Sequence, residues 1–307
     1  MKDRVDQYII KGLAFADRGK HDKALASFDA AITINTSSYT AWHNRGVAMY
    51  NLGRFAEAID AFELANAINP DNIETRITRG IVLDDMGRHK DAVDAFDTAL
   101  AIDPQNAETW NTRGIALENL GQYEEALASY DRAIDITIEF AGAWSNRGHV
   151  LQNLERFLEA IDSYNKAIAL EPNAFFAWNN RGNVLIELGQ FTEAVASYDK
   201  SIEIDPKDAA TWNNRGNALV ELDRYPDALA SYDQALNIDP KDAAAWNNRG
   251  NVLIELIRYD DALASYDKVL ALEPENDDVR ENRKNALKQK KEASVPAKIP
   301  KTKKGKN

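Results

Sequence analysis

Cysteine is absent from this sequence of 307 residues. Disulfide bonds, thiol nucleophiles and cysteine metal sites are therefore excluded. No apolar run approaches the roughly 18 residues that a membrane-spanning helix needs. The first residues, MKDRVDQYIIKGLAFADRGK, lack the uninterrupted apolar core of a signal peptide. These absences predict a cytoplasmic protein.

Positive charge is scarce outside the C-terminal end. The net charge is −12, but residues 288–307 contain eight lysines and one acid, for a local net of +7. Residues 1–287 therefore carry −19. This negative charge argues against nucleic-acid binding by residues 1–287. Contact with a membrane surface is expected only from the lysine-rich end.

A 34-residue repeat organises most of the chain. All six tryptophans fall on one slot of it: Trp42, Trp110, Trp144, Trp178, Trp212 and Trp246. With that slot numbered 4, position 8 is always glycine, position 20 always alanine and position 24 always Phe or Tyr. Position 32 is proline in six of eight repeats. Repetition at a fixed period indicates a repeat architecture, in which each unit buries its apolar face against its neighbours.

This pattern of W, G, A, aromatic and P resembles the tetratricopeptide repeat (TPR) family. The resemblance implies an all-α fold, an alpha-alpha superhelix in which helix-turn-helix repeats stack into a right-handed TPR solenoid with a concave groove. The expected organisation of residues 1–276 is eight repeats, 5–38, 39–72, 73–106, 107–140, 141–174, 175–208, 209–242 and 243–276. A capping helix is expected at 277–290, and a disordered lysine-rich tail at 291–307.

The small residues at positions 8 and 20 suit a close contact between two helices. The aromatic residues at positions 4 and 24 are predicted to fill the volume around that contact. Four polar residues stand where the first helix of the next repeat needs an N-cap: Asn72, Asn106, Asp208 and Asp242. Position 7 is arginine in repeats 2 to 8, and position 25 of the preceding repeat is usually acidic. We expect ion pairs between these slots, because a half-buried arginine needs a carboxylate partner.

Asparagines gather on the other side of each first helix, which lines the groove in this family. The predicted groove residues are Asn44, Asn111, Asn146, Asn179, Asn180, Asn183, Asn213, Asn214, Asn217, Asn247, Asn248 and Asn251, with Glu187, Glu221 and Glu255. Asparagine is a poor helix former, so its retention on this side favours a binding role. A carboxamide can bond both the N–H and the C=O of an extended chain. The alternative explanations for these asparagines are that they only contact solvent in the groove, or that they result from recent duplication of repeats.

Such a ladder is similar to the asparagine-lined superhelix of O-linked N-acetylglucosamine transferase. This sequence carries no glycosyltransferase domain, so that activity is not implied. Position 5 holds no lysine, which argues against the carboxylate clamp of chaperone-binding TPR proteins. His43 and His149 lie three repeats apart, too far to share a metal. No phosphate-binding glycine loop or catalytic triad is present, so we expect no enzyme activity, cofactor, metal or small-molecule substrate.

The sequence therefore predicts a scaffold that binds an extended segment of an unidentified protein or peptide in its concave groove. The alternative is a self-assembling TPR array, a homo-oligomer whose groove is idle. Ile136, Ile138 and Phe140, where the fourth repeat lacks its proline, are a candidate patch for such assembly.

Overall fold

The computed structural model describes residues 2–293, and within them the chain forms seventeen α-helices and no strand. The helices are α1 Lys2–Ala16, α2 His21–Ile34, α3 Tyr39–Asn51, α4 Phe55–Ile68, α5 Ile73–Asp85, α6 His89–Leu100, α7 Ala107–Asn119, α8 Tyr123–Ile136, α9 Ala141–Asn153, α10 Phe157–Leu170, α11 Phe175–Glu187, α12 Phe191–Ile204, α13 Ala209–Val220, α14 Tyr225–Ile238, α15 Ala243–Glu255, α16 Tyr259–Leu272 and α17 Asp277–Ala293. The predicted all-α, helical-repeat fold is confirmed.

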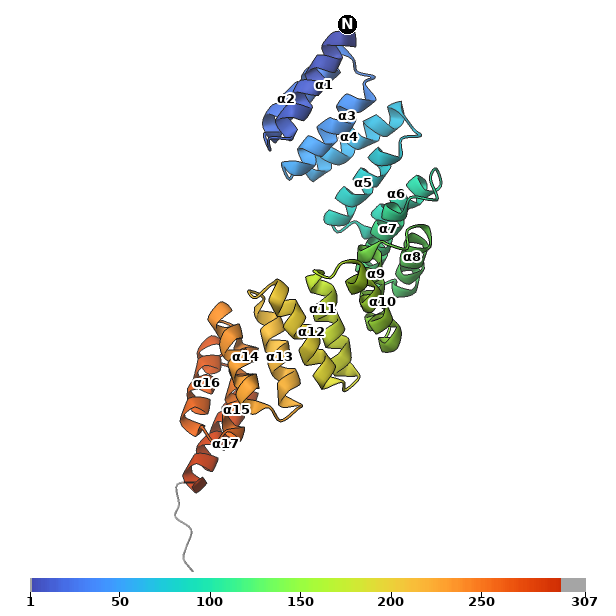
Figure 1. The fold of residues 1–307 in the computed structure, drawn as a ribbon. Coiled ribbons are helices and arrows are strands. Elements are labelled where there is room, and N and C mark those ends of the chain that lie inside the picture. Colours follow the sequence, from blue (N-terminus) through green and yellow to red (C-terminus); the bar gives the residue numbers. More distant parts are fainter. Residues whose placement is uncertain (1, 294–307) are drawn as a thin grey trace, which may run out of the picture. The chain divides into compact units, whose positions relative to one another are not determined.

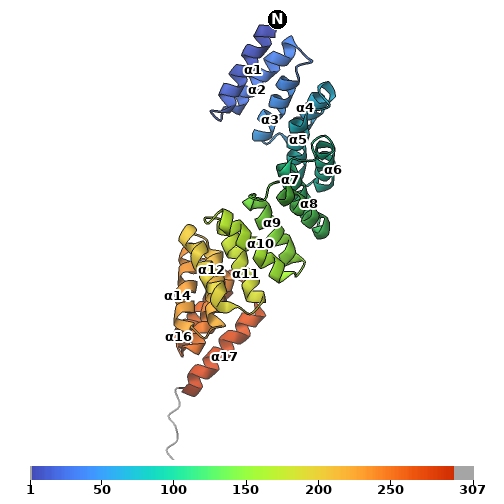
Figure 2. The same ribbon diagram turned by 45° about the vertical axis from the view of Figure 1, so that its right-hand side comes forward.

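The chain divides into two compact parts, one ending at Leu170 and the other beginning at Glu171. The N-terminal part contains α1–α10 and the C-terminal part contains α11–α17 (Figures 1 and 2). Within each part, consecutive helices pack as pairs, such as α13 with α14. The first helices of successive pairs also touch, as α13 does with α15. This second contact aligns the repeat positions of neighbouring first helices side by side.

The core of each helix pair lies where glycine meets an aromatic ring. Tyr232 of α14 is 1% exposed, and a Cβ atom on Gly216 of α13 would lie 2.5 Å from its Cε1 atom. The same contact recurs in every pair, from Gly12 with Phe28 to Gly250 with Tyr266. The alanines at position 20 are fully buried beside it. The predicted close approach of the two helices is confirmed.

The tryptophans lie beside that contact, packed against buried residues between successive repeats, as Trp212 and Trp246 are against the cluster that contains Leu236. The indoles are half-buried, and each donates its Nε1–H to the carbonyl oxygen six residues earlier, as Trp212 does to Pro206 at 3.1 Å. Trp246 bonds Pro240 in the same way, at 3.0 Å. A buried indole N–H must find an acceptor, and the turn between repeats supplies one. The tryptophans therefore close the turns between repeats, while position 24 alone supplies the central ring.

The predicted N-caps are present. Asn72, Asn106, Asp208 and Asp242 each accept a hydrogen bond from the backbone N–H three residues later. The turn after the first helix needs a left-handed residue, which is glycine at four predicted positions, with φ between 68° and 74°. Ile257 occupies this turn in the last pair with φ 59°, although L-residues, and β-branched ones above all, rarely adopt that conformation.

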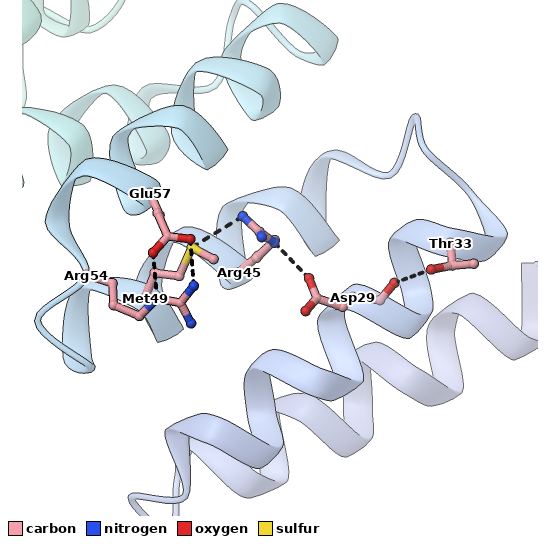
Figure 3. Close-up of polar contacts among 6 residues, drawn as sticks. All are labelled: Asp29, Thr33, Arg45, Met49, Arg54 and Glu57. Carbon is pink, nitrogen blue, oxygen red and sulfur yellow. Dashed lines mark hydrogen bonds and ion pairs between the residues drawn. The ribbon is translucent and has the colours of Figure 1, made fainter.

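The predicted ion pairs between successive repeats are also confirmed. In seven cases the arginine lies 2.6–2.9 Å from the acid: Arg45–Asp29, Arg79–Glu63, Arg113–Asp97, Arg147–Asp131, Arg215–Asp199, Arg249–Asp233 and Arg283–Asp267. Figure 3 shows the first of them, with Arg45 also directed at the sulfur of Met49. Four of these guanidiniums also donate to a serine of their own helix pair, as Arg215 does to Ser231 at 2.7 Å, and Arg181 donates to Ser197 in the same way.

The last helix, α17, is longer than predicted. It begins at Asp277 as expected but runs to Ala293, so residues 291–293, placed in the tail by the sequence prediction, are helical. The ion pair of Lys288 with Glu292, one turn apart, supports this extension. Val279 and Ala286 are its buried residues. The remainder of the predicted tail, 294–307, lies outside the described residues.

Candidate functional site

The predicted asparagines of the C-terminal part lie on one surface formed by α11, α13, α15 and α17. We call it the asparagine face, and its members are Asn179, Asn180, Asn183, Glu187, Asn213, Asn214, Asn217, Glu221, Asn247, Asn248, Asn251, Glu255, Asn282, Asn285 and Gln289. Positions 5, 6, 9 and 13 of each repeat supply these residues. They come together because each first helix packs against the next one.

Hydrogen bonds tie the asparagines of successive helices to one another. Asn214 of α13 donates its Nδ2–H to Oδ1 of Asn183 on α11, at 3.2 Å. Asn248 of α15 donates in the same way to Asn217, at 3.0 Å, and to Asn213, at 3.3 Å. One role of these side chains is therefore to join repeats. This role was not predicted from the sequence.

Tyrosine hydroxyls fix the asparagines at position 9. The hydroxyl of Tyr232 donates to Oδ1 of Asn217, and that of Tyr266 donates to Oδ1 of Asn251, both at 2.8 Å. Burial raises the pKa of the Tyr232 hydroxyl, and the negative charge of Glu221 raises it further. This hydroxyl therefore stays protonated at neutral pH and remains a donor.

Because their amide oxygens accept from tyrosine, the amide nitrogens of Asn217 and Asn251 remain available, whereas that of Asn183 donates to Asn179 at 3.2 Å. Among residues 2–293, the Nδ2 groups of Asn217 and Asn251 have no hydrogen-bond acceptor. Each can donate two hydrogen bonds to a ligand.

A pocket of about 460 Å³ opens on the asparagine face between α13 and α15. Its lining residues are Asn217, Val220, Glu221, Tyr225, Tyr232, Asn248, Asn251, Val252 and Glu255. A second pocket, of about 290 Å³, follows between α15 and α17 and shares Asn251 and Glu255 with the first. The volume of the first pocket lies in the range typical of ligand sites.

In the N-terminal part the predicted asparagines contact mostly protein atoms. Asn44 donates to the Thr40 carbonyl of its own helix, at 2.8 Å. Asn111 is buried and accepts a 3.0 Å hydrogen bond from Asn146. The sequence assigned them to the same kind of lining as those of the C-terminal part, but no described pocket of the N-terminal part contains them.

Two groups of site residues were missed from the sequence. Asn282, Asn285 and Gln289 of α17 continue the face, and counting on by 34 residues from Asn248, Asn251 and Glu255 would have found them. The hydroxyls of the position-24 tyrosines were missed because that slot was considered only as packing. The sequence does indicate a contact between positions 24 and 9. Position 24 is Phe in repeats 1 to 3, where position 9 is apolar, and Tyr wherever position 9 is asparagine.

Residues 2–293 contain no three His, Asp or Glu side chains close enough together to hold a metal ion. No helix of that range is long and apolar enough to cross a membrane.

Comparison with protein families identifies the repeat. Family models described as tetratricopeptide repeat match residues 11–73, 77–139, 141–174, 163–196 and 243–276, and one described as TPR repeat matches 182–223 and 216–256. The chain belongs to the tetratricopeptide repeat family. TPR proteins in general mediate protein–protein interactions and are typically non-catalytic scaffolds. No curated protein matches the sequence.

Several solved TPR structures are similar to this chain. YrrB, described as a TPR protein with an unusual peptide-binding site, is 25% identical over 65% of this chain and 99% of its own, with a TM-score of 0.55. MamA is 26% identical over 56% of this chain and 94% of its own, with a TM-score of 0.51. The C-terminal part of a TPR protein from Cytophaga hutchinsonii is 18% identical, covers 77% of this chain and 97% of its own, and has a TM-score of 0.64. That last likeness shows the fold alone.

Proposed function

We propose that the C-terminal part binds an extended segment of another polypeptide across its asparagine face. The observation that carries this proposal is the pair of pockets that follow one another from α13 to α17 and share Asn251 and Glu255. Recesses that recur at the spacing of the repeat suit a ligand that crosses several helices, as an extended chain does. The proposal takes residues 5–276 as eight repeats and α17 as the helix that caps them.

The available donors suit the backbone of such a segment. The carboxamide oxygens of Asn217 and Asn251 accept hydrogen bonds from tyrosine hydroxyls, which fixes the direction of their Nδ2–H groups. Carbonyl oxygens of an extended chain would accept from them with little regard to sequence. The side chains of these asparagines are already held in place, so less conformational entropy is lost on binding. The peptide-binding site named for YrrB, a protein of similar fold, supports the same use of this one.

The test fills the pockets while leaving the asparagine hydrogen bonds intact. Val220 and Ile254 are half-buried, line the two pockets and are both changed to tryptophan. The matched control carries Ile238→Trp and Leu272→Trp, at exposed apolar positions of α14 and α16 outside both pockets. Each protein is checked for helicity by circular dichroism and used to capture polypeptides from a lysate of the source cell. We expect the wild type and the control to retain the same partner, and the pocket-filled variant to lose it.

Self-assembly with an idle groove is the competing outcome of the same experiment. It predicts that all three proteins retain an identical set, or only copies of this chain. Light scattering on the purified proteins then reports the assembly mass, which would exceed that of one chain. Ile138 is 71% exposed, so Ile138→Ser should lower that mass if the predicted patch holds the copies together.

A further inference from the structure

The two glutamates of the larger pocket have no partner within the described residues. Glu221 and Glu255 are exposed carboxylates, and neither makes an ion pair or a hydrogen bond with any of residues 2–293. No lysine, arginine or histidine is among the residues that line the pocket. The pocket therefore holds two negative charges that the protein itself does not neutralise.

In the N-terminal part, three acidic residues at position 13, which Glu221 and Glu255 occupy, or at the neighbouring position 12 are partnered. Asp84 contacts Nδ1 of His89 at 2.6 Å and accepts from Asn119 at 3.2 Å. Asp85 accepts from the hydroxyl of Tyr50, at 2.5 Å. Glu118 accepts from the hydroxyl of Tyr130, at 3.0 Å, and contacts the ring of His149. At position 13, Asp85 therefore has a partner, whereas Glu221 and Glu255 have none among residues 2–293.

The arginines of the same repeats are already engaged. Arg215 and Arg249 are bound by Asp199 and Asp233 in the ion pairs between repeats. Arg224 and Arg258 pair with Asp227 and Asp261 one turn further along their helices. These four arginines therefore do not balance the charge of the pocket.

We infer that the pocket between α13 and α15 takes a lysine or arginine side chain of the bound segment, with Glu221 and Glu255 as its two carboxylates. This inference rests on the function proposed above. Val220 and Val252 give the pocket an apolar surface for the methylene stem of such a side chain. The hydroxyl of Tyr225, also in the lining, adds an oxygen near the cationic end. The Nδ2–H groups of Asn217 and Asn251 stay free for backbone carbonyls, so one face binds the main chain and selects the side chain.

The probe is a random peptide library displayed on phage, selected on the full-length protein. The test variant carries Glu221→Gln and Glu255→Gln, which keep the shape of the pocket and remove both charges. The control carries Glu171→Gln and Glu203→Gln, two exposed acids of the same part that lie outside the pocket. We expect the wild type and the control to enrich peptides containing lysine or arginine, and the test variant to select peptides without that enrichment.

A synthetic peptide from the selection then gives the affinity. Changing its basic residue to glutamine should weaken binding to the wild type roughly tenfold, because a hydrogen bond to a charged group is stronger than one between neutral groups. The same change should have little effect on binding to the Glu221→Gln, Glu255→Gln variant. Salt should weaken the wild-type complex and leave the variant complex nearly unchanged.

The alternative outcomes separate the two claims. Peptides that bind the wild type but not the pocket-filled variant, yet show no preference for basic residues, would overturn the inference and leave the proposed function standing. Failure to select any peptide that distinguishes those two proteins would count against both.

The chain's own C-terminal lysines are the other candidate occupant. A variant with every lysine after residue 293 changed to glutamine should bind the synthetic peptide with the same affinity as the wild type. Markedly tighter binding by that variant would assign the pocket to the C-terminal segment and overturn the choice of an external partner.

Discussion

At the scale of single residues, Ile257 departs most clearly from the repeat. It adopts φ 59° in a turn where five repeats use glycine and two use Glu155 or Asp223, and its β-branched side chain is 70% exposed. The left-handed conformation costs an L-residue roughly 1–2 kcal/mol, and little burial offsets it. Ile257→Gly should therefore raise the free energy of unfolding by up to about 1 kcal/mol, after the entropy that glycine adds to the unfolded chain. Thermal denaturation measures the change.

The matched substitution for that prediction is Gly189→Ile, in the equivalent turn after α11, where φ is 68°. It should lower the melting temperature. A drop with Ile257→Gly, or no loss with Gly189→Ile, would show that strain in these turns is not what limits stability.

His149 gives the N-terminal part a dependence on pH. Its hydrogen bond with Glu118 raises the pKa of His149, against the opposing effect of burial. A raised folded pKa means that the pair stabilises the fold fully below the unfolded pKa of about 6.5 and loses this contribution as pH rises through the folded pKa. The melting temperature of wild type should exceed that of His149→Gln by more at about pH 5.5 than at about pH 9. The other histidines are common to both proteins, so a gap independent of pH would contradict the account.

Single residues also show where sequence reasoning reaches its limit. The asparagines of the C-terminal face were found because asparagine disfavours helix and yet recurs at fixed positions. Which of their atoms stay free could not be predicted, because it depends on the hydroxyl of Tyr232 and the amide of Asn248 meeting one oxygen of Asn217. That convergence arises only when two helix pairs are packed together.

At the scale of the element, the helix starts follow local chemistry that the sequence shows. Asp208 and Asp242 were predicted as N-caps and accept from Thr211 and Ala245. The core positions of each helix pair were equally predictable, since glycine and alanine mark where backbones approach. The hydrogen bond of the tryptophans to the turns between repeats was not predictable, because a large ring near a helix contact is assigned to the core unless the acceptor for its N–H is known.

α11 begins without a side-chain cap, and a change there should add stability. Its N-cap residue is Ala174, whose backbone, with φ −71° and ψ 85°, is close to that of Asp208, with φ −82° and ψ 101°. Ala174→Asp should increase the free energy of unfolding by about 1 kcal/mol, through a side-chain hydrogen bond to a backbone N–H of the first turn and a favourable charge at the helix start. Asp208→Ala should decrease it by a similar amount. Urea denaturation of the two variants checks both signs, and an unchanged midpoint for either would contradict the capping account.

At the scale of the molecule, the sequence predicted the fold far better than the site. A period of 34 residues with fixed small and aromatic slots constrains the packing of every helix pair, so the all-α helical-repeat fold followed from it. The site depends instead on which polar groups remain unpaired after folding. Asp85 and Glu221 occupy the same repeat position, but within residues 2–293 only Asp85 has a partner, the hydroxyl of Tyr50. We therefore propose that binding takes place on the face formed by α11, α13, α15 and α17.

The central claim is that a polypeptide segment lies on that face, and side-chain amide NMR tests it most directly. The protein is labelled with ¹⁵N, its asparagine side chains are assigned, and a peptide selected from the phage library is titrated in. The account predicts that the NH₂ signals of Asn217 and Asn251 shift on binding, while those of Asn237, exposed on α14 outside both pockets, do not. Shifts at Asn237 with none at Asn217 and Asn251 would place the ligand elsewhere and contradict the account.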